Sequence, residues 1–136
     1  MNNKIYLDIN IVADMIDQNR KEHEKSLEIL KKTIWDATVL CISEDTLSTL
    51  FYISKDKNAT LLFIQNVILV DWEVSIFGKS VISKAIELSL QKGLDLEDLL
   101  QCLCAQENKC NILITNDKKF YDCGMKIYTS DEFLTL

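Results

Sequence analysis

Short apolar runs alternate with segments of helical periodicity along this chain. The apolar runs have the length of buried strands, and in the segments between them apolar side chains recur every three or four residues. Strands are predicted, in chain order, at residues 4–7, 38–42, 67–70, 111–115 and 125–129. Strands that alternate with helices are typical of βαβ units. We therefore predict an α/β fold, a three-layer α/β/α sandwich around a mostly parallel sheet of four to five strands.

Several polar residues stand where helices are expected to begin or end. Ser43 is the expected N-cap of the helix after the second strand, and Asp71 or Ser75 that of the long helix after the third. Gly93 is expected just beyond the end of that long helix, because glycine readily adopts the left-handed conformation that ends many helices. Asp95 is the expected N-cap of the following helix.

The spacing of apolar residues also predicts which helix faces are buried. Leu27, Leu30 and Ile34 are expected on the buried face of the helix before the second strand. Residues 96–104 have the cleanest helical period, with leucines at positions 96, 99, 100 and 103. The chain is expected to end in a short helix or a tail over residues 130–136.

Length and composition fit one globular domain over residues 1–136, with 48% hydrophobic and 26% charged residues. No apolar run approaches the ~20 residues that span a bilayer, and the first residues lack the apolar region of a signal peptide. We expect a cytoplasmic protein that does not contact the membrane. The net charge of −6 argues against binding duplex nucleic acid through a broad cationic surface. It is compatible with an enzyme that meets phosphate through metal ions.

Cysteine and histidine usage narrows the chemistry further. The five cysteines are an odd number without a C-x-x-C motif, so we expect reduced and mostly buried thiols. His23 is the only histidine and has no cysteine beside it in the sequence. Structural zinc and histidine-based catalysis are therefore both disfavoured.

Three acidic residues follow predicted strands or begin a predicted helix near them. Asp8 comes directly after the first strand, Asp117 lies two residues after the fourth, and Asp98 lies in the first turn of the helix before the fourth. Two carboxylates about 4 Å apart repel by roughly 4 kcal/mol at an effective dielectric constant near 20. If the three meet, either some are protonated or a hard cation such as Mg²⁺ or Mn²⁺ lies between them. Water bound to that ion is the reagent for hydrolysis of a phosphodiester.

Each of these residues also has an ordinary structural interpretation. Asp8 could cap the helix that follows it. Asp98 lies three residues after Asp95 and could be the third-position carboxylate of a capping arrangement. Asp117 could be a turn residue. The residue pattern alone leaves these alternatives open.

Three motifs resemble those of the PIN-domain family (PilT N-terminus), and the resemblance covers nearly the whole chain. YLDINIV at residues 6–12 resembles the first motif, in which the aspartate is a metal ligand supported by a polar residue two positions later. DLEDLLQCLCA at residues 95–105 resembles the third, with Asp98 at the acidic position. ILITNDKKF at residues 112–120 resembles the fourth, with Thr115 and Asp117 at the functional positions.

The resemblance implies a PIN-like fold and a Mg²⁺- or Mn²⁺-dependent endoribonuclease that acts on single-stranded RNA. Small family members of this kind are commonly toxins of VapC-type toxin–antitoxin pairs and often form homodimers, so a small antitoxin protein and a second copy are expected partners. The implied metal ligands and catalytic residues are Asp8, Asp98 and Asp117, with Asn10, Thr115 and Asn116 supporting them. Lys118 and Lys119 are expected to contact phosphate.

The sequence departs from the family at one position. The family usually has a glutamate in the helix after the second strand, where this chain has Thr49. Asp45 lies one turn earlier on the same helix face and is a possible substitute through a water molecule. Its ordinary interpretation, which we prefer, is a charge that complements the helix dipole.

Two alternative functions follow from these features. The missing glutamate allows a catalytically degenerate PIN module that binds a partner without cutting RNA. A receiver-like signalling domain is also a parallel α/β fold with acidic residues at strand ends, and its phosphorylatable aspartate, after the third strand, would be Asp71. That alternative is disfavoured because Asp8 has no acidic neighbour and the chain contains no proline.

Overall fold

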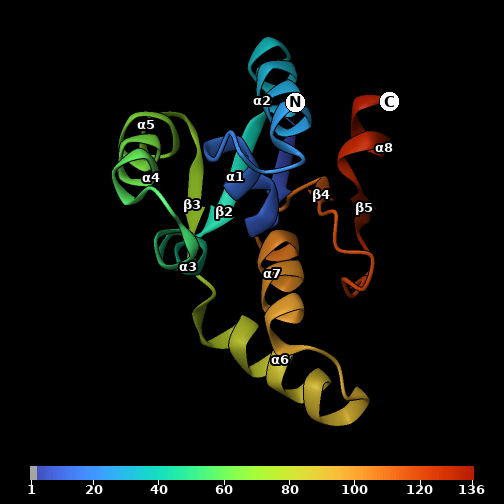
Figure 1. Cartoon of the computed structure of the whole chain (residues 1–136). Helices are drawn as coiled ribbons and strands as arrows, with labels where there is room; N and C mark the ends of the chain where they lie inside the picture. The colour runs from blue at the N-terminus through green and yellow to red at the C-terminus, as the bar shows by residue number, and fades with distance from the viewer. Residues whose placement is uncertain (1–2) are drawn as a thin grey trace.

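Figure 1 shows a computed structural model of the chain, which describes residues 3–136 as one central sheet flanked by helices. The five strands are parallel to their neighbours and lie in the order β3-β2-β1-β4-β5. They are β1 (Lys4–Leu7), β2 (Val39–Ser43), β3 (Glu73–Ser75), β4 (Ile112–Ile114) and β5 (Lys126–Tyr128). The predicted α/β/α sandwich is confirmed, and the sheet is wholly rather than mostly parallel.

The helices fill the connections between the strands, as the alternating pattern predicts. They are α1 (Ile9–Ile16), α2 (His23–Trp35), α3 (Glu44–Ile53), α4 (Lys57–Phe63), the π-helix η1 (Ile64–Ile68), α5 (Leu69–Asp71), α6 (Gly78–Lys92), α7 (Leu96–Glu107) and α8 (Ser130–Leu134). None of the helices described over residues 3–136 is both long and apolar enough to cross a bilayer.

The two faces of the sheet are covered by different helices because successive strand residues point to opposite sides. On one face, strand side chains pack with α1, α2 and α3 in the main apolar cluster, which includes Ile5, Leu7, Leu40, Ile42, Ile114, Ile11, Val12, Ile29 and Leu50. On the other face, a second cluster combines strand residues with Cys104 and Ala105 of α7: Tyr6, Cys41 and Leu113. Burial on both faces holds the ends of β1 and β4 in fixed positions.

Three of the predicted helix ends are confirmed by hydrogen bonding and backbone geometry. The Ser43 hydroxyl accepts the Thr46 backbone N–H, and an Asp95 carboxylate oxygen accepts the Asp98 N–H. Gly93 ends α6 in the left-handed conformation at φ +67°.

The prediction of a third strand at residues 67–70 is wrong. This apolar run lies in η1 and α5, which continue the helical segment that begins at Lys57. Ile68 is fully buried, whereas Leu69 and Val70 are 62% and 68% exposed, so only one side of the run meets the core. A short apolar run cannot by itself distinguish a strand from a helical turn.

The observed third strand moves the start of the next helix. Asp71 lies in α5 and Ser75 in β3, so neither caps α6, whose N-cap residue is Phe77. Since Asp71 precedes β3 instead of following it, the aspartate that a receiver-like domain requires after this strand is absent from that position.

The predicted buried face of α2 is confirmed in part: Leu27 and Leu30 are partly buried, and Leu30 packs against the main apolar cluster. Ser26, Ile29 and Thr33 are its buried residues, while Ile34 is 70% exposed. α2 packs against both α1 and α8. The pattern of large apolar residues therefore found Leu27 and Leu30, but it left out Ser26 and Thr33, which are more deeply buried than either.

Cys102 and Cys123 form a disulfide, contrary to the expectation of reduced thiols throughout. The bond joins α7 to the segment between β4 and β5 across a sequence separation of 21 residues. Among the free thiols, Cys41 and Cys104 are buried as expected and Cys110 is partly buried. The absence of a C-x-x-C motif gave no hint of a pair so distant in sequence.

We expect the Cys102→Ser/Cys123→Ser double variant to unfold with a free energy about 3 kcal/mol lower than the oxidised wild type. The reason is that the cross-link restricts the unfolded chain over a loop of this length. Urea denaturation, monitored by circular dichroism, measures the difference. Dithiothreitol should lower the stability of the wild type and of the Cys110→Ser variant, which keeps the disulfide, and should leave the double variant unchanged. An equal response of the Cys110→Ser variant and the double variant to dithiothreitol would contradict the disulfide.

Candidate active site

Asp8 lies at the carboxyl end of β1 and is held there by three hydrogen bonds. Its backbone N–H donates to the Ile114 carbonyl at 3.0 Å, which continues the pairing of β1 with β4. One carboxylate oxygen accepts the Ile9 N–H at 2.8 Å, and the other accepts the Thr115 hydroxyl at 2.7 Å. Asp8 is thus the N-cap of α1, as its ordinary interpretation holds, and it is also joined to the end of β4.

Thr115 connects Asp8 to Asp117. The threonine is buried, and while its hydroxyl donates to Asp8 its oxygen accepts the Asp117 N–H at 3.1 Å. The Asp117 carboxylate accepts the Lys119 N–H at 2.9 Å, which closes a tight turn after β4. A single hydroxyl therefore fixes the orientation of one carboxylate and the backbone that carries another.

Asp98 approaches from the first turn of α7. Burial raises the pKa of its carboxyl to about 6, and the negative charge of Asp95 adds to the rise. The charges of Asp117 and Asp8 raise this pKa further, while a backbone hydrogen bond from Tyr121 lowers it. Asp98 thus lies in the electrostatic field of both strand-end aspartates.

The pKa of Asp8 responds to the same surroundings. Burial raises it most, and the Asp117 charge adds to this effect. The hydrogen bonds from Thr115 and Ile9 act in the opposite direction because they stabilise the ionised carboxylate. The charge of Asp117 thus acts on both Asp8 and Asp98, and the charge of Asp8 acts on Asp98 as well.

Glu97 is a member of this environment that the sequence analysis missed. Burial raises its pKa first, followed by the charges of Asp45, Asp95 and Asp8. The available signal was the pair of adjacent carboxylates, Glu97 and Asp98, in the first turn of α7. We call the group Asp8, Asp45, Asp95, Glu97, Asp98 and Asp117 the acidic cluster.

The Thr49 hydroxyl, at the position of the family's glutamate, is hydrogen-bonded within its own helix. The hydroxyl donates to the Asp45 carbonyl at 3.1 Å, one turn earlier in α3. The Asp45 side chain is exposed at the start of α3, and its charge acts on Glu97. Asp45 lies one turn before Thr49 in α3, and its charge acts on Glu97 of α7, so these two carboxylates belong to the same part of the structure.

The other predicted residues lie around the acidic cluster in different roles. Asn10 is exposed, and its side-chain oxygen accepts an Arg20 N–H at 3.2 Å. The Asn116 amide is engaged with Ser130 of α8 through two 2.9 Å hydrogen bonds, so it anchors the end of β4 to that helix. Lys118 and Lys119 are exposed in the turn after Asp117.

The donor set of the acidic cluster fits a hard divalent cation. Its members offer only oxygen ligands, and within residues 3–136 none of them forms an ion pair with a basic side chain. No group of three or more histidine, cysteine, aspartate or glutamate side chains in that range is close enough to hold a metal ion by itself. Mg²⁺ does not require such a cage, because it commonly keeps several waters and uses one or two carboxylates.

Known proteins share both the sequence and the fold of this chain. Residues 5–124 match the family described as PIN domain. The chain is 34% identical over 134 residues to Ribonuclease VapC1 of Aquifex aeolicus (strain VF5). This alignment covers 96% of the present chain and 92% of that protein.

Solved structures of toxin–antitoxin proteins have the same fold. A chain of VapBC2 from Rickettsia felis, bound to a promoter DNA fragment, aligns with a TM-score of 0.66 at 23% identity over 93% of this chain and 98% of that one. VapC20 of Mycobacterium tuberculosis, a toxin that cleaves the sarcin–ricin loop, aligns with a TM-score of 0.69 at 14% identity over 89% and 95%.

In the absence of divalent cations, we expect Asp98→Asn to be more stable than the wild type near pH 7 and equally stable near pH 4. The raised pKa means that the folded wild type binds an additional proton, so its stability falls as pH rises from about 4 to about 6. The asparagine side chain does not titrate and avoids this loss. We expect a difference of about 1 kcal/mol, because solvent screens this partly exposed carboxyl.

Urea denaturation in EDTA at both pH values measures this difference. Asp36→Asn is the matched control, since Asp36 is exposed at the end of α2. A lower stability of Asp98→Asn near pH 7 would contradict the repulsion that we assign to the acidic cluster.

Proposed function

The chain belongs to the PIN-domain family, and from that premise we propose that it is a Mg²⁺- or Mn²⁺-dependent endoribonuclease that hydrolyses phosphodiester bonds in single-stranded RNA. The observation that carries the proposal is that the Thr115 hydroxyl is hydrogen-bonded both to the Asp8 carboxylate and to the Asp117 backbone N–H. The charges of these two aspartates also raise the pKa of Asp98. The 34% identity to Ribonuclease VapC1 supports the same reaction.

Asp8 and Asp98 are the proposed principal metal ligands, and Asp117 completes the site directly or through water. When bound, the metal ion supplies an activated water and neutralises charge on the phosphate. Thr115 orients the Asp8 carboxylate by donating to one of its oxygens. Because ligand carboxylates must be ionised, the raised pKa values of Asp8 and Asp98 should weaken metal binding as pH falls toward about 6.

We propose that the chain acts in the cytoplasm as the toxin of a toxin–antitoxin pair. The structural relatives from Rickettsia felis and Klebsiella pneumoniae are toxin–antitoxin complexes, which supports a small antitoxin protein as a partner. Exposed apolar residues of α6, namely Ile82, Ile86 and Leu90, offer a surface for the expected homodimer.

A catalytically degenerate PIN module that binds a partner is the second candidate. Thr49 favours it, because the usual glutamate is replaced by a hydroxyl that is hydrogen-bonded within its own helix. Asp45 and Glu97 favour retained activity, because they supply carboxylates to the same region.

We expect the wild type to cleave single-stranded RNA in the presence of Mn²⁺, and Asp8→Asn to be at least ~100-fold slower, because loss of one charged ligand weakens metal binding or its orientation. Gel electrophoresis of a labelled RNA after incubation measures the rate. Asp36→Asn controls for the change of an exposed aspartate at a distant helix end. Identical cleavage by the wild type and Asp8→Asn would indicate a contaminating nuclease and contradict catalysis at this site.

We expect Mn²⁺ to raise the melting temperature of the wild type and to have little effect on Asp8→Asn, because a ligand that binds only the folded state stabilises it. Thr49→Glu should bind Mn²⁺ more tightly than the wild type, since it restores a carboxylate where the family has one. Thermal denaturation over a series of Mn²⁺ concentrations measures both effects. Equal Mn²⁺ responses in the wild type and Asp8→Asn would exclude Asp8 as a ligand.

A further inference from the structure

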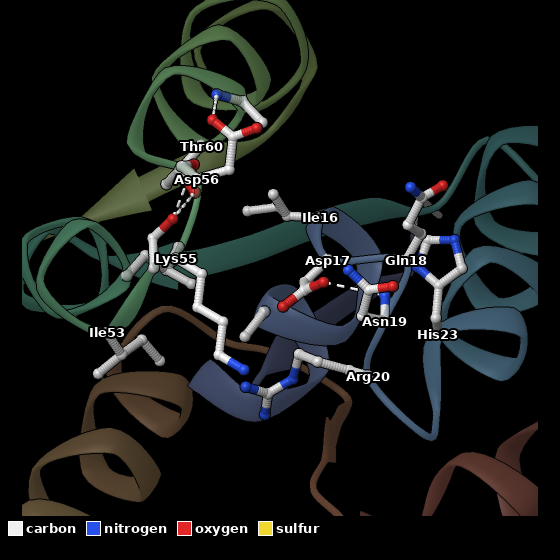
Figure 2. Close-up of a pocket in the computed structure, with 14 residues that line it drawn as sticks. Ile16, Asp17, Gln18, Asn19, Arg20, His23, Ile53, Lys55, Asp56 and Thr60 are labelled. Atoms are coloured by element: carbon white, nitrogen blue, oxygen red, sulfur yellow. Dashed lines mark hydrogen bonds between the residues drawn. The ribbon is translucent and has the colours of Figure 1, made fainter.

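Two pockets share the side chain of Arg20, and the smaller of them is lined in part by Asp117 of the acidic cluster. A pocket of about 400 Å³ is lined by Arg20, Lys21 and Asn10 together with Asp117 of the acidic cluster. A pocket of about 560 Å³ lies between the loop after α1 and the α3–α4 region, and its lining includes Arg20, His23, Lys55 and Asp56 (Figure 2). Arg20 therefore lines both the pocket that contains Asp117 and the larger pocket, which has no role in the proposed cleavage reaction.

Arg20 is held in place by an ion pair with the buried carboxylate of Asp14. Its Nε donates to the Asp14 carboxylate at 2.7 Å, and Nη2 donates to the Asn10 side-chain oxygen at 3.2 Å. Asp14 is only 6% exposed, so this ion pair is well shielded from solvent. A guanidinium has five N–H donors in a rigid fork, and these two contacts leave donors for a ligand. About a third of the arginine side chain is accessible.

Two further cations flank Arg20. Lys21 lines the smaller pocket and Lys55 the larger one, and both side chains are exposed. Over residues 3–136 neither lysine takes part in an ion pair. In Figure 2, the charged ends of Arg20 and Lys55 are directed toward the same part of the pocket.

Carboxylates also line both pockets, and the net charge that a ligand meets depends on the hydrogen bonds and ion pairs that these carboxylates form. In the larger pocket, Asp17 accepts the Asn19 N–H at 2.9 Å and Asp56 accepts the Ala59 N–H at 3.0 Å. In the smaller pocket, Glu22 pairs with Lys25 at 3.4 Å. These interactions partly satisfy the acidic groups locally, whereas Lys21 and Lys55 remain available to an anion.

We propose that Arg20, Lys21 and Lys55 bind phosphates of the single-stranded RNA substrate. These phosphates are neighbours, along the same strand, of the phosphate that is cleaved at the acidic cluster. We call these three residues the phosphate track. The inference rests on the proposed function for its substrate. A chain with a net charge of −6 repels RNA as a whole, so cations close to the cleavage site must supply the local attraction. The planar guanidinium fork matches the oxygens of a phosphate, and the lysines act as point charges beside it.

We test the phosphate track by measuring the affinity of a short fluorescent single-stranded RNA, using fluorescence anisotropy in the Asp8→Asn background to separate binding from cleavage. Lys21→Gln and Lys55→Gln should each weaken binding about threefold to tenfold and lower the slope of log affinity against log salt by about 0.7. Lys31→Gln is the matched control, because Lys31 is exposed on α2 and lines neither pocket.

Arg20 requires a compensated variant. Removal of Arg20 alone would leave the buried Asp14 carboxylate without its partner and destabilise the fold. The Asp14→Asn/Arg20→Gln double variant removes both charges, and circular dichroism checks that it remains folded. We expect it to weaken RNA binding about tenfold or more. If it does not fold, the two lysine variants decide the question.

The outcomes separate this inference from the proposed function. Cleavage of RNA by the wild type, with unchanged RNA affinity in the lysine variants, overturns the phosphate track and leaves the ribonuclease intact. Selective loss of binding in a protein that never cleaves RNA supports the phosphate track and contradicts the catalytic proposal. No measurable RNA binding, or an equal loss in Lys31→Gln, overturns the phosphate track.

Discussion

Mutual repulsion among carboxylates at one edge of the sheet is the constraint on which the rest of this structure depends. Burial raises the pKa values of Asp8 and Asp98 most, and the charges of the neighbouring aspartates raise them further. The Thr115 hydroxyl offsets part of this effect by stabilising ionised Asp8. A divalent cation would offset the remainder, so the same electrostatic tension that opposes folding favours the proposed metal-dependent chemistry.

Rigid surroundings are needed to maintain such a cluster. α7 is fixed to the sheet through buried Gln101, whose side-chain oxygen accepts the Tyr6 and Ser43 hydroxyls. The disulfide between Cys102 and Cys123 joins the same helix to the segment that follows Asp117. Asn116 ties the end of β4 to α8. Hydrogen bonds and one disulfide therefore fix the elements that carry Asp98 and Asp117.

The cationic surroundings of the cluster complement its negative centre. Arg20 is held by Asp14 and Asn10, so one face of its guanidinium serves the fold while its remaining donors adjoin the pockets. An acidic protein that acts on a polyanion has to place its few useful cations close to the reacting phosphate. The proposed metal ion and the proposed phosphate track would both supply positive charge at the same place.

The sequence by itself determined the α/β class and most of the strand and helix positions, because periodicity and capping depend on residues close together in the chain. It also pointed to Asp8, Asp98 and Asp117 as candidates, since each lies at a predicted strand end or helix start. It misplaced the third strand, because the run at residues 67–70 has the same apolar character in a strand as in the helical turn that it forms.

Only the tertiary structure decided which distant groups meet. The Cys102–Cys123 disulfide, the contribution of Glu97 and the shared position of Arg20 between two pockets all depend on segments far apart in the sequence. Local patterns specify the elements, but the packing of helices against the sheet sets the distances between their side chains. Electrostatic coupling depends on those distances, which is why the chemistry of the site required the folded chain.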